Sequence, residues 1–100
     1  MTDTESAWVA GLFEGEGWVG IAKGKYPYLI LKMTDEDVIL KLQETVGGGC
    51  VHRREGAKDH HKPLYVWDKM GRVFAETLYE QIKPHLGTRR TARFEEVLKV

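Results

Sequence analysis

Two carboxylates near the start of the chain stand between glycines. Glu14 and Glu16 belong to the run Glu14-Gly15-Glu16-Gly17, which follows the apolar segment formed by residues 7–13. We expect that segment to be helical and Glu16 to project from the Gly-x-Gly turn that ends it. An acid at the carboxyl end of a helix opposes the helix dipole, which favours a functional role for Glu16 over a merely solvated terminus. Its carboxylate is a ligand of the type that Mg²⁺ prefers.

Basic residues are concentrated in the second half of the chain. Fifteen Lys and Arg balance fifteen Asp and Glu, so the formal net charge is zero. Residues 1–50 hold four lysines against eight acids, whereas residues 51–100 hold eleven basic residues, including all six arginines, against seven acids. This asymmetry permits a basic face on a protein without net charge, which keeps nucleic acid among the candidate partners.

The elements that position these residues are predicted from the spacing of apolar residues and from the turns between them. We predict a helix over residues 5–14, strands over 18–23 and 28–33, and a helix capped by Thr34. Strands over 50–54 and 64–70 follow, then a helix opened by Gly71 and a last helix capped by Thr88. Thr2 or Thr4 is expected to cap the first helix, and Thr2 with Glu5 has capping-box spacing. The order αββαββα(α) indicates one α+β domain with a four-stranded antiparallel sheet.

The first helix is apolar on all sides, which a helix on the surface of a small monomer would not need to be. Ala7, Gly11 and Gly15 share one stripe, and a glycine inside a helix costs about 1 kcal/mol relative to alanine. Close approach of a second backbone would explain Gly11, although a helix buried in a monomer core is the alternative. We therefore predict a homodimer through this helix. The expected interface residues are Ala7, Trp8, Ala10, Gly11, Phe13, Glu14 and Gly15.

The run from Val9 to Gly17 (VAGLFEGEG) resembles the LAGLIDADG signature of homing endonucleases, with acids at its sixth and eighth positions. Residues 34–38 (TDEDV), 46–49 (VGGG) and 65–67 (YVW) look like further features of that family, and the element order is also similar. The resemblance implies a site-specific double-strand DNA endonuclease that acts as a homodimer on a pseudo-palindromic site. The chain contains one motif, and cutting both strands requires two acids, which also favours a homodimer.

The resemblance further implies which residues act. Glu16 and the carbonyl of Gly15 would bind Mg²⁺; Mn²⁺ would substitute for it, and Ca²⁺ would bind without supporting cleavage. Glu14, at the sixth position, is expected to orient the turn or the helix end and not to bind the metal. Arg89, then Arg90, is the candidate for the basic residue near the metal, and Asp35 stands where many relatives have a polar amide. A catalytically silent DNA-binding regulator and an intron splicing cofactor on the same scaffold remain open as alternatives.

One face of the predicted sheet could enter the major groove of DNA, where base edges are distinguishable. Alternation along the strands and the positions of the hairpin tips select the candidate DNA contacts. They are Trp18, Lys23, Lys25, Tyr28, Ile30, Lys32, His52, Arg54, Lys58, Lys62, Val66 and Asp68. Arg54 and Lys32 could donate to guanine, while Ile30 and Val66 could meet a thymine methyl group.

Several classes of protein are disfavoured. The single cysteine, Cys50, excludes an internal disulfide framework. The apolar run 7–13 is too short to span a bilayer, and no signal-peptide pattern is present. We therefore expect an intracellular protein of the cytoplasm or nucleoid, with an organelle left open and no membrane partner. His60 and His61 lack the accompanying ligands of a structural zinc site.

Overall fold

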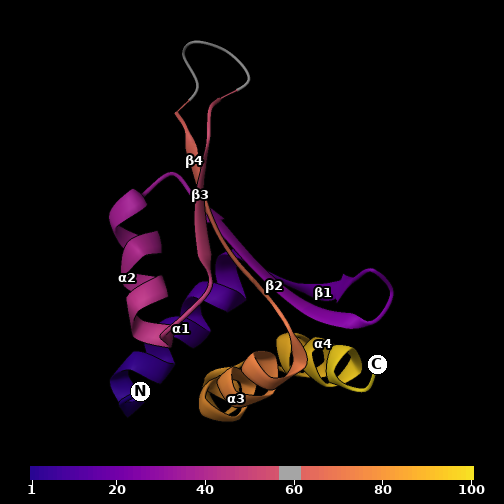
Figure 1. Cartoon of the computed structure of the whole chain (residues 1–100). Helices are drawn as coiled ribbons and strands as arrows, with labels where there is room; N and C mark the ends of the chain where they lie inside the picture. The colour runs from indigo at the N-terminus through magenta and orange to yellow at the C-terminus, as the bar shows by residue number, and fades with distance from the viewer. Residues whose placement is uncertain (57–61) are drawn as a thin grey trace.

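A computed structural model of the chain describes residues 1–56 and 62–100, and in that part the helices pack against one face of an antiparallel sheet (Figure 1). The sheet has four strands in the order β1-β2-β4-β3. The elements are α1 (Asp3–Glu16), β1 (Gly17–Ala22), β2 (Tyr26–Met33), α2 (Glu36–Val46), β3 (Cys50–Arg54), β4 (Leu64–Met70), α3 (Arg72–Ile82), the 3₁₀ helix η1 (Lys83–His85) and α4 (Thr88–Leu98). The predicted α+β class and element order are confirmed.

Two hairpins build the sheet. β1 pairs with β2 and β3 pairs with β4, while β2 and β4 join the hairpins in the middle. The register forms rows across the sheet, of which one runs through Trp18, Ile30, Asp68 and Cys50. The hairpins diverge because the sheet is strongly twisted, as Figure 1 shows. Side chains of one row point to the same face, so this register decides which residues can act together.

The core lies between the sheet and the helices and is centred on Phe13. Its ring meets Trp67 of β4 edge-to-face at a centroid distance of 6.1 Å and Phe94 of α4 at 6.0 Å. All three side chains are fully buried. Trp67 also donates from Nε1 to the carbonyl of Gly48 at 2.9 Å. Phe13 therefore fixes the last turn of α1 against both the sheet and α4.

The ends of three helices differ from the predictions. The predicted capping box of Thr2 and Glu5 is confirmed. However, α1 continues through Gly15 to Glu16, because Phe13 packs against Trp67 and Phe94 and sustains the last turn. Thr34 does not cap α2, since the N-cap is Asp35, whose side chain makes no capping hydrogen bond. Thr88 is the first residue of α4, and the N-cap is Gly87.

α1 is covered on one face and uncovered on another. Val9, Ala10 and Phe13 are fully buried in the core, whereas Ala7, Gly11 and Gly15 are exposed. Within a single chain, therefore, only one side of α1 is covered, and the side with Ala7, Gly11 and Gly15 is left open. Among the described residues, no helix has the length and apolar character required to cross a membrane.

Candidate active site

Glu16 lies at the junction between α1 and β1. It is the last residue of the helix, and β1 begins at the next residue, Gly17, so the expected Gly-x-Gly turn is absent. The N–H of Gly17 donates to the carbonyl of Phe13, and a Cβ at Gly17 would lie 2.5 Å from Cδ1 of that ring. This close approach requires glycine. Because Phe13 is anchored in the core, the backbone that carries the exposed Glu16 side chain has a fixed place at the start of β1.

Oxygen donors are available at this junction. The Glu16 carboxylate is exposed, and the Gly15 carbonyl belongs to the last turn of α1, where carbonyls lack partners within the helix. Both lie at the negative end of the helix dipole, and hard oxygen donors suit Mg²⁺. In residues 1–56 and 62–100, no three acidic, histidine or cysteine side chains are placed to hold a metal ion together. The remaining ligands of such an ion would have to come from water, a phosphate or a second chain.

A hollow beside Glu16 opens on the side of the sheet opposite the helices, called here the open face. Glu16, Trp18, Ile30 and Lys32 line it. Trp18 is the register partner of Ile30, and its ring lies over Gly20, where a Cβ would come within 2.1 Å of it. The hollow thus brings the expected metal ligand next to three of the predicted DNA contacts.

Three arginines of α4 form a second hollow at the start of β1. Arg89, Arg90 and Arg93 line it together with residues 17–19. Trp18 also lines the hollow that contains Glu16, so the two hollows meet at this residue of β1. Two of the arginines, Arg89 and Arg90, are the predicted basic candidates. A basic cluster of this kind can neutralise a phosphate.

Arg93 belongs to the arginine cluster, although we did not predict it from the sequence. Its Nε donates to the carbonyl of Val19 at 2.8 Å, and its guanidinium also pairs with Glu96. Arg93 follows Arg89 by four residues and Arg90 by three, which places all three on one helical face. That spacing was the signal in the sequence that could have revealed it.

Glu14 is bonded to the start of this arginine helix, directly before Arg89 and Arg90. Its Oε1 accepts a hydrogen bond from the N–H of Gly87 at 2.6 Å, and Gly87 is the N-cap of α4. This contact supports the expectation that Glu14 orients the helix end. Asp35, by contrast, lies at the start of α2 and lines neither of the two hollows. Neither hollow therefore joins Asp35 to Glu16, and its water-positioning role stays a prediction.

The open face has the composition that alternation predicted. The register aligns the side chains of this face in rows. They comprise Trp18, Tyr28, Ile30, Lys32, His52, Arg54, Val66 and Asp68. The prediction that Val66 contacts DNA is wrong. Val66 is only 2% exposed, because its short side chain lies between Lys32 and His52 on the neighbouring strands. It therefore cannot meet a thymine methyl group as predicted.

Asp68 is the centre of a polar group on the open face. Its Oδ2 lies 3.2 Å from Nε2 of His52. Burial, followed by the charge of Asp68 and a hydrogen bond to it, raises the pKa of the Tyr28 hydroxyl. Tyr28 also meets Trp18 edge-to-face at a centroid distance of 6.2 Å. Asp68 thus pairs with His52 and shifts the pKa of the Tyr28 hydroxyl, which are two of the other predicted contacts.

The predicted phosphate contacts lie at the ends of the hairpins. Lys23 and Lys25 are exposed at the tip between β1 and β2, where Lys23 has a positive φ of 54°. Lys62 is exposed just before β4. Lys58, together with His60 and His61, lies outside the described residues. Lys23, Lys25 and Lys62 can therefore present positive charges to phosphates at the margin of the open face.

The predicted dimer residues divide into two sets. Ala10 and Phe13 have no exposed area within the single chain, because both face the core, and their side chains cannot reach a second copy. Ala7, Gly11 and Gly15, called here the α1 stripe, are exposed, and a Cβ at Gly11 or Gly15 would meet no atom within 4 Å. Trp8, beside the stripe, is half-buried and lies under the ammonium of Lys41 at 4.5 Å.

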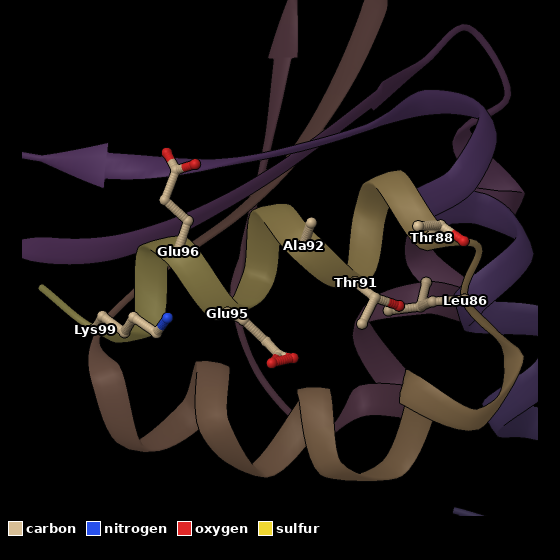
Figure 2. A pocket seen from close by; sticks show the side chains of 7 residues that line it. All are labelled: Leu86, Thr88, Thr91, Ala92, Glu95, Glu96 and Lys99. Atoms are coloured by element: carbon tan, nitrogen blue, oxygen red, sulfur yellow. The ribbon is translucent and has the colours of Figure 1, made fainter.

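Another hollow lies along α4 (Figure 2), and Glu16 is not among the residues that line it. Its lining includes the acids Glu95 and Glu96 beside the single cation Lys99. Glu95 points toward α3 in Figure 2 and accepts a hydrogen bond from the Tyr79 hydroxyl at 3.1 Å. Two carboxylates repel a phosphate backbone, so the arginine cluster and not this hollow is the candidate site for DNA.

Solved structures of homing endonucleases have the same fold. The structure of I-CvuI in complex with its target matches with a TM-score of 0.79 and 19% identity, over 97% of this chain and 65% of that chain. I-TnaI matches with a TM-score of 0.65 and 23% identity, over 94% and 69% of the two chains. The LAGLIDADG homing endonuclease I-GzeII in complex with its DNA target matches with a TM-score of 0.67 and 16% identity, over 94% and 34%.

These likenesses establish the fold that the nonapeptide resemblance implied. No family model matches the sequence, and no curated protein matches it either. The chain spans 65% of the length of I-CvuI. The chain has the LAGLIDADG homing endonuclease fold, although comparison of its sequence alone finds no match.

Proposed function

We propose that the chain is one subunit of a homodimeric, site-specific DNA endonuclease that hydrolyses phosphodiester bonds with Mg²⁺. One observation carries the proposal. Glu16 lies where α1 meets the open face, in a hollow shared with Trp18, Ile30 and Lys32. An acid so placed would stand beside the backbone of a duplex whose bases contact the sheet. The fold shared with DNA-bound homing endonucleases supports this interpretation.

The residues divide the work of hydrolysis between them. Glu16 and the Gly15 carbonyl would hold Mg²⁺, which supplies charge neutralisation and an activated water when bound. Arg89 and Arg90 would contact the scissile phosphate and stabilise the charge that develops on it. Mn²⁺ is expected to replace Mg²⁺, and Ca²⁺ to support DNA binding without cleavage.

The homodimer would be formed by the α1 stripe. The stripe is exposed in the single chain, and its glycines leave open space where a second helix could approach. Each copy carries one Glu16, so two copies would supply the two acids needed for a double-strand cut. Two-fold symmetry of the protein would then correspond to a pseudo-palindromic target.

The open face would read the target. Arg54 and Lys32 can donate to guanine, and Ile30 can meet a thymine methyl group. Lys23, Lys25 and Lys62 would contact flanking phosphates, which position the protein without specifying sequence. Lys58 is proposed for the same role from the sequence alone.

The test uses a plasmid that carries the insertion locus of the protein's own gene, with Mg²⁺ in one arm and Ca²⁺ in the other. Wild type is expected to make one specific double-strand cut with Mg²⁺ and to bind without cutting in Ca²⁺. Glu16→Gln is expected to abolish the cut while binding in Ca²⁺ persists. Binding without any cut by wild type would instead support the silent regulator or splicing cofactor, and a cut unchanged by Glu16→Gln would refute the proposed metal ligand.

A further inference from the structure

We infer that Glu14 is a positioning residue that ties the arginine helix to the helix end bearing Glu16. The inference deepens the proposed function and rests on it. Glu14 Oε1 accepts the N–H of Gly87 at 2.6 Å across 73 residues of sequence. Glu14 stands two positions before Glu16 on α1, and Gly87 stands two positions before Arg89 on α4. One hydrogen bond thus joins the two halves of the candidate site.

The start of α4 needs a partner from elsewhere. The first N–H groups of a helix have no acceptor within the helix, and the N-cap Gly87 has no side chain with which to provide one. The carboxylate of Glu14 fills this place with a short, charge-assisted bond. Its negative charge also lies at the positive end of the α4 dipole, where it is stabilising. Glu14 is therefore a helix cap supplied by another helix.

The cap decides where the arginines stand. Arg89 and Arg90 lie in the first turn of α4, directly after the bonded Gly87, and line the hollow at residues 17–19. Nε of Arg90 is buried and has no hydrogen-bond partner among the described residues, so bonds made by that atom do not fix the side chain. A second contact, from Arg93 to the Val19 carbonyl at 2.8 Å, holds the next turn of α4 to β1. Arg90 therefore depends on the helix backbone for its place, and Arg89 stands on the same turn.

The chain offers a pair of variants that separates the bond from the glycine. Gly87 has φ −77° and ψ 171°, and Leu86 is extended at φ −88° and ψ 149°, so proline fits the backbone at position 87. Gly87→Pro removes the donating N–H. Gly87→Ala keeps the N–H, and its Cβ would lie 3.4 Å from the Glu14 carboxylate oxygens, an ordinary contact. Glu14→Ala removes the acceptor, and Glu5→Ala is its control at the other end of α1.

The experiment measures single-turnover cleavage of the plasmid with saturating protein and Mg²⁺, and DNA affinity in Ca²⁺. Because misplacement by about 1 Å can cost roughly a hundredfold in rate, Glu14→Ala and Gly87→Pro should each slow cleavage by about ten- to a hundredfold with affinity nearly unchanged. The double variant should be no slower than either single variant, since both remove one contact. Gly87→Ala and Glu5→Ala should cleave like wild type.

A further arm distinguishes positioning from mere folding. Arg89→Ala should slow wild type but have little added effect in Glu14→Ala, because the arginine is already displaced. Wild-type rates in folded Glu14→Ala, or additive effects of Glu14→Ala and Arg89→Ala, would overturn the inference. Amide exchange at Gly87 reports the bond without DNA and should be slow in wild type and fast in Glu14→Ala. A wild-type chain that protects this amide but never cuts would refute the proposed function and, with it, the catalytic consequence of the bond.

Discussion

The two ends of α1 use the same chemistry for different purposes. At the first end, Glu5 accepts the N–H of Thr2 at 2.8 Å, and Thr2 Oγ1 accepts the N–H of Glu5 at 3.1 Å. At the far end, Glu14 accepts the N–H of Gly87, which belongs to another helix. The first contact is complete within four residues, whereas the second requires the whole fold. A local cap stabilises one helix, but a cap between helices also sets their relative position.

Acidic residues at the two ends of α1 also have opposite effects on the stability of the helix. Asp3 and Glu5 lie in the first turn of α1, where an acid is favourable to the helix dipole. Glu16 lies at the last residue, where no basic residue accompanies it within the turn and its charge is unfavourable. The end that would be easier to stabilise with a cation instead presents an exposed acid beside the open face.

The largest effect is expected from Glu16→Gln, compared with Glu5→Gln at the other end of α1, in both cleavage rate and melting temperature. Glu16→Gln should slow cleavage by roughly a hundred- to a thousandfold or more, since one lost electrostatic group at a transition state costs about that. It should also raise the melting temperature slightly, because an unfavourable charge at the helix end is removed. Glu5→Gln should do the reverse, with normal cleavage and a slightly lower melting temperature.

Cleavage assays and thermal unfolding of both variants at low ionic strength provide the measurement. The comparison fails if Glu16→Gln is less stable than wild type, because Glu16 would then be a structural residue. It also fails if Glu5→Gln cleaves more slowly while remaining folded at the assay temperature.

The next prediction concerns the middle of α1. Gly11→Leu should fit the single chain, where a Cβ meets no atom within 4 Å, but should crowd a second helix packed on the α1 stripe. Overpacking costs about 1–3 kcal/mol, so the dissociation constant of the dimer should rise by roughly five- to a hundredfold. Sedimentation equilibrium checks it, with Gln81→Leu on the exposed side of α3 as the matched control. Equal dissociation constants for the two variants would exclude the stripe as the interface.

The fold was largely predictable from the sequence because its signals are local. The capping box, the strand ranges 50–54 and 64–70, and the alternation of Trp18, Tyr28 and Ile30 depend on neighbouring residues only. Helix ends were less predictable. Gly15 lies inside α1 because packing of Phe13 sustains the last turn, and this tertiary effect overrides the weak helix propensity of glycine.

The candidate site was predictable in part. Glu16 was found because a nine-residue pattern marks it, and Arg89 and Arg90 because the family resemblance implies a basic residue after the third helix. The bond between Glu14 and Gly87 spans 73 positions, and no local pattern indicates it. The burial of Val66 and Ala10 was likewise hidden, because alternation tells which face a side chain points to but not what its neighbours cover.

A smaller effect is expected from the hydroxyl that closes the local cap. Thr2→Ala removes the acceptor for the N–H of Glu5 and should lower the free energy of unfolding by about 1 kcal/mol, the usual cost of a lost N-cap. Urea unfolding followed by circular dichroism measures it. Cleavage should not change, since the first end of α1 is far from residues 17–19. A loss of cleavage larger than the loss of folded protein would show that both ends of α1 serve the site.

The smallest expected effect is the pH dependence of that cap. The hydrogen bond from the Thr2 N–H, followed by that from the Thr2 hydroxyl, lowers the pKa of Glu5 below its usual value of 4.5. A carboxyl whose pKa is lower in the folded state stabilises the fold above the unfolded value, and this contribution is lost as pH falls through the folded value. Wild type should therefore be more stable than Glu5→Gln at neutral pH, and the gap should close below pH 4.5. Melting temperatures of both proteins from neutral pH downward measure the gap; a constant difference would mean that the amide fails as a cap for reasons other than charge.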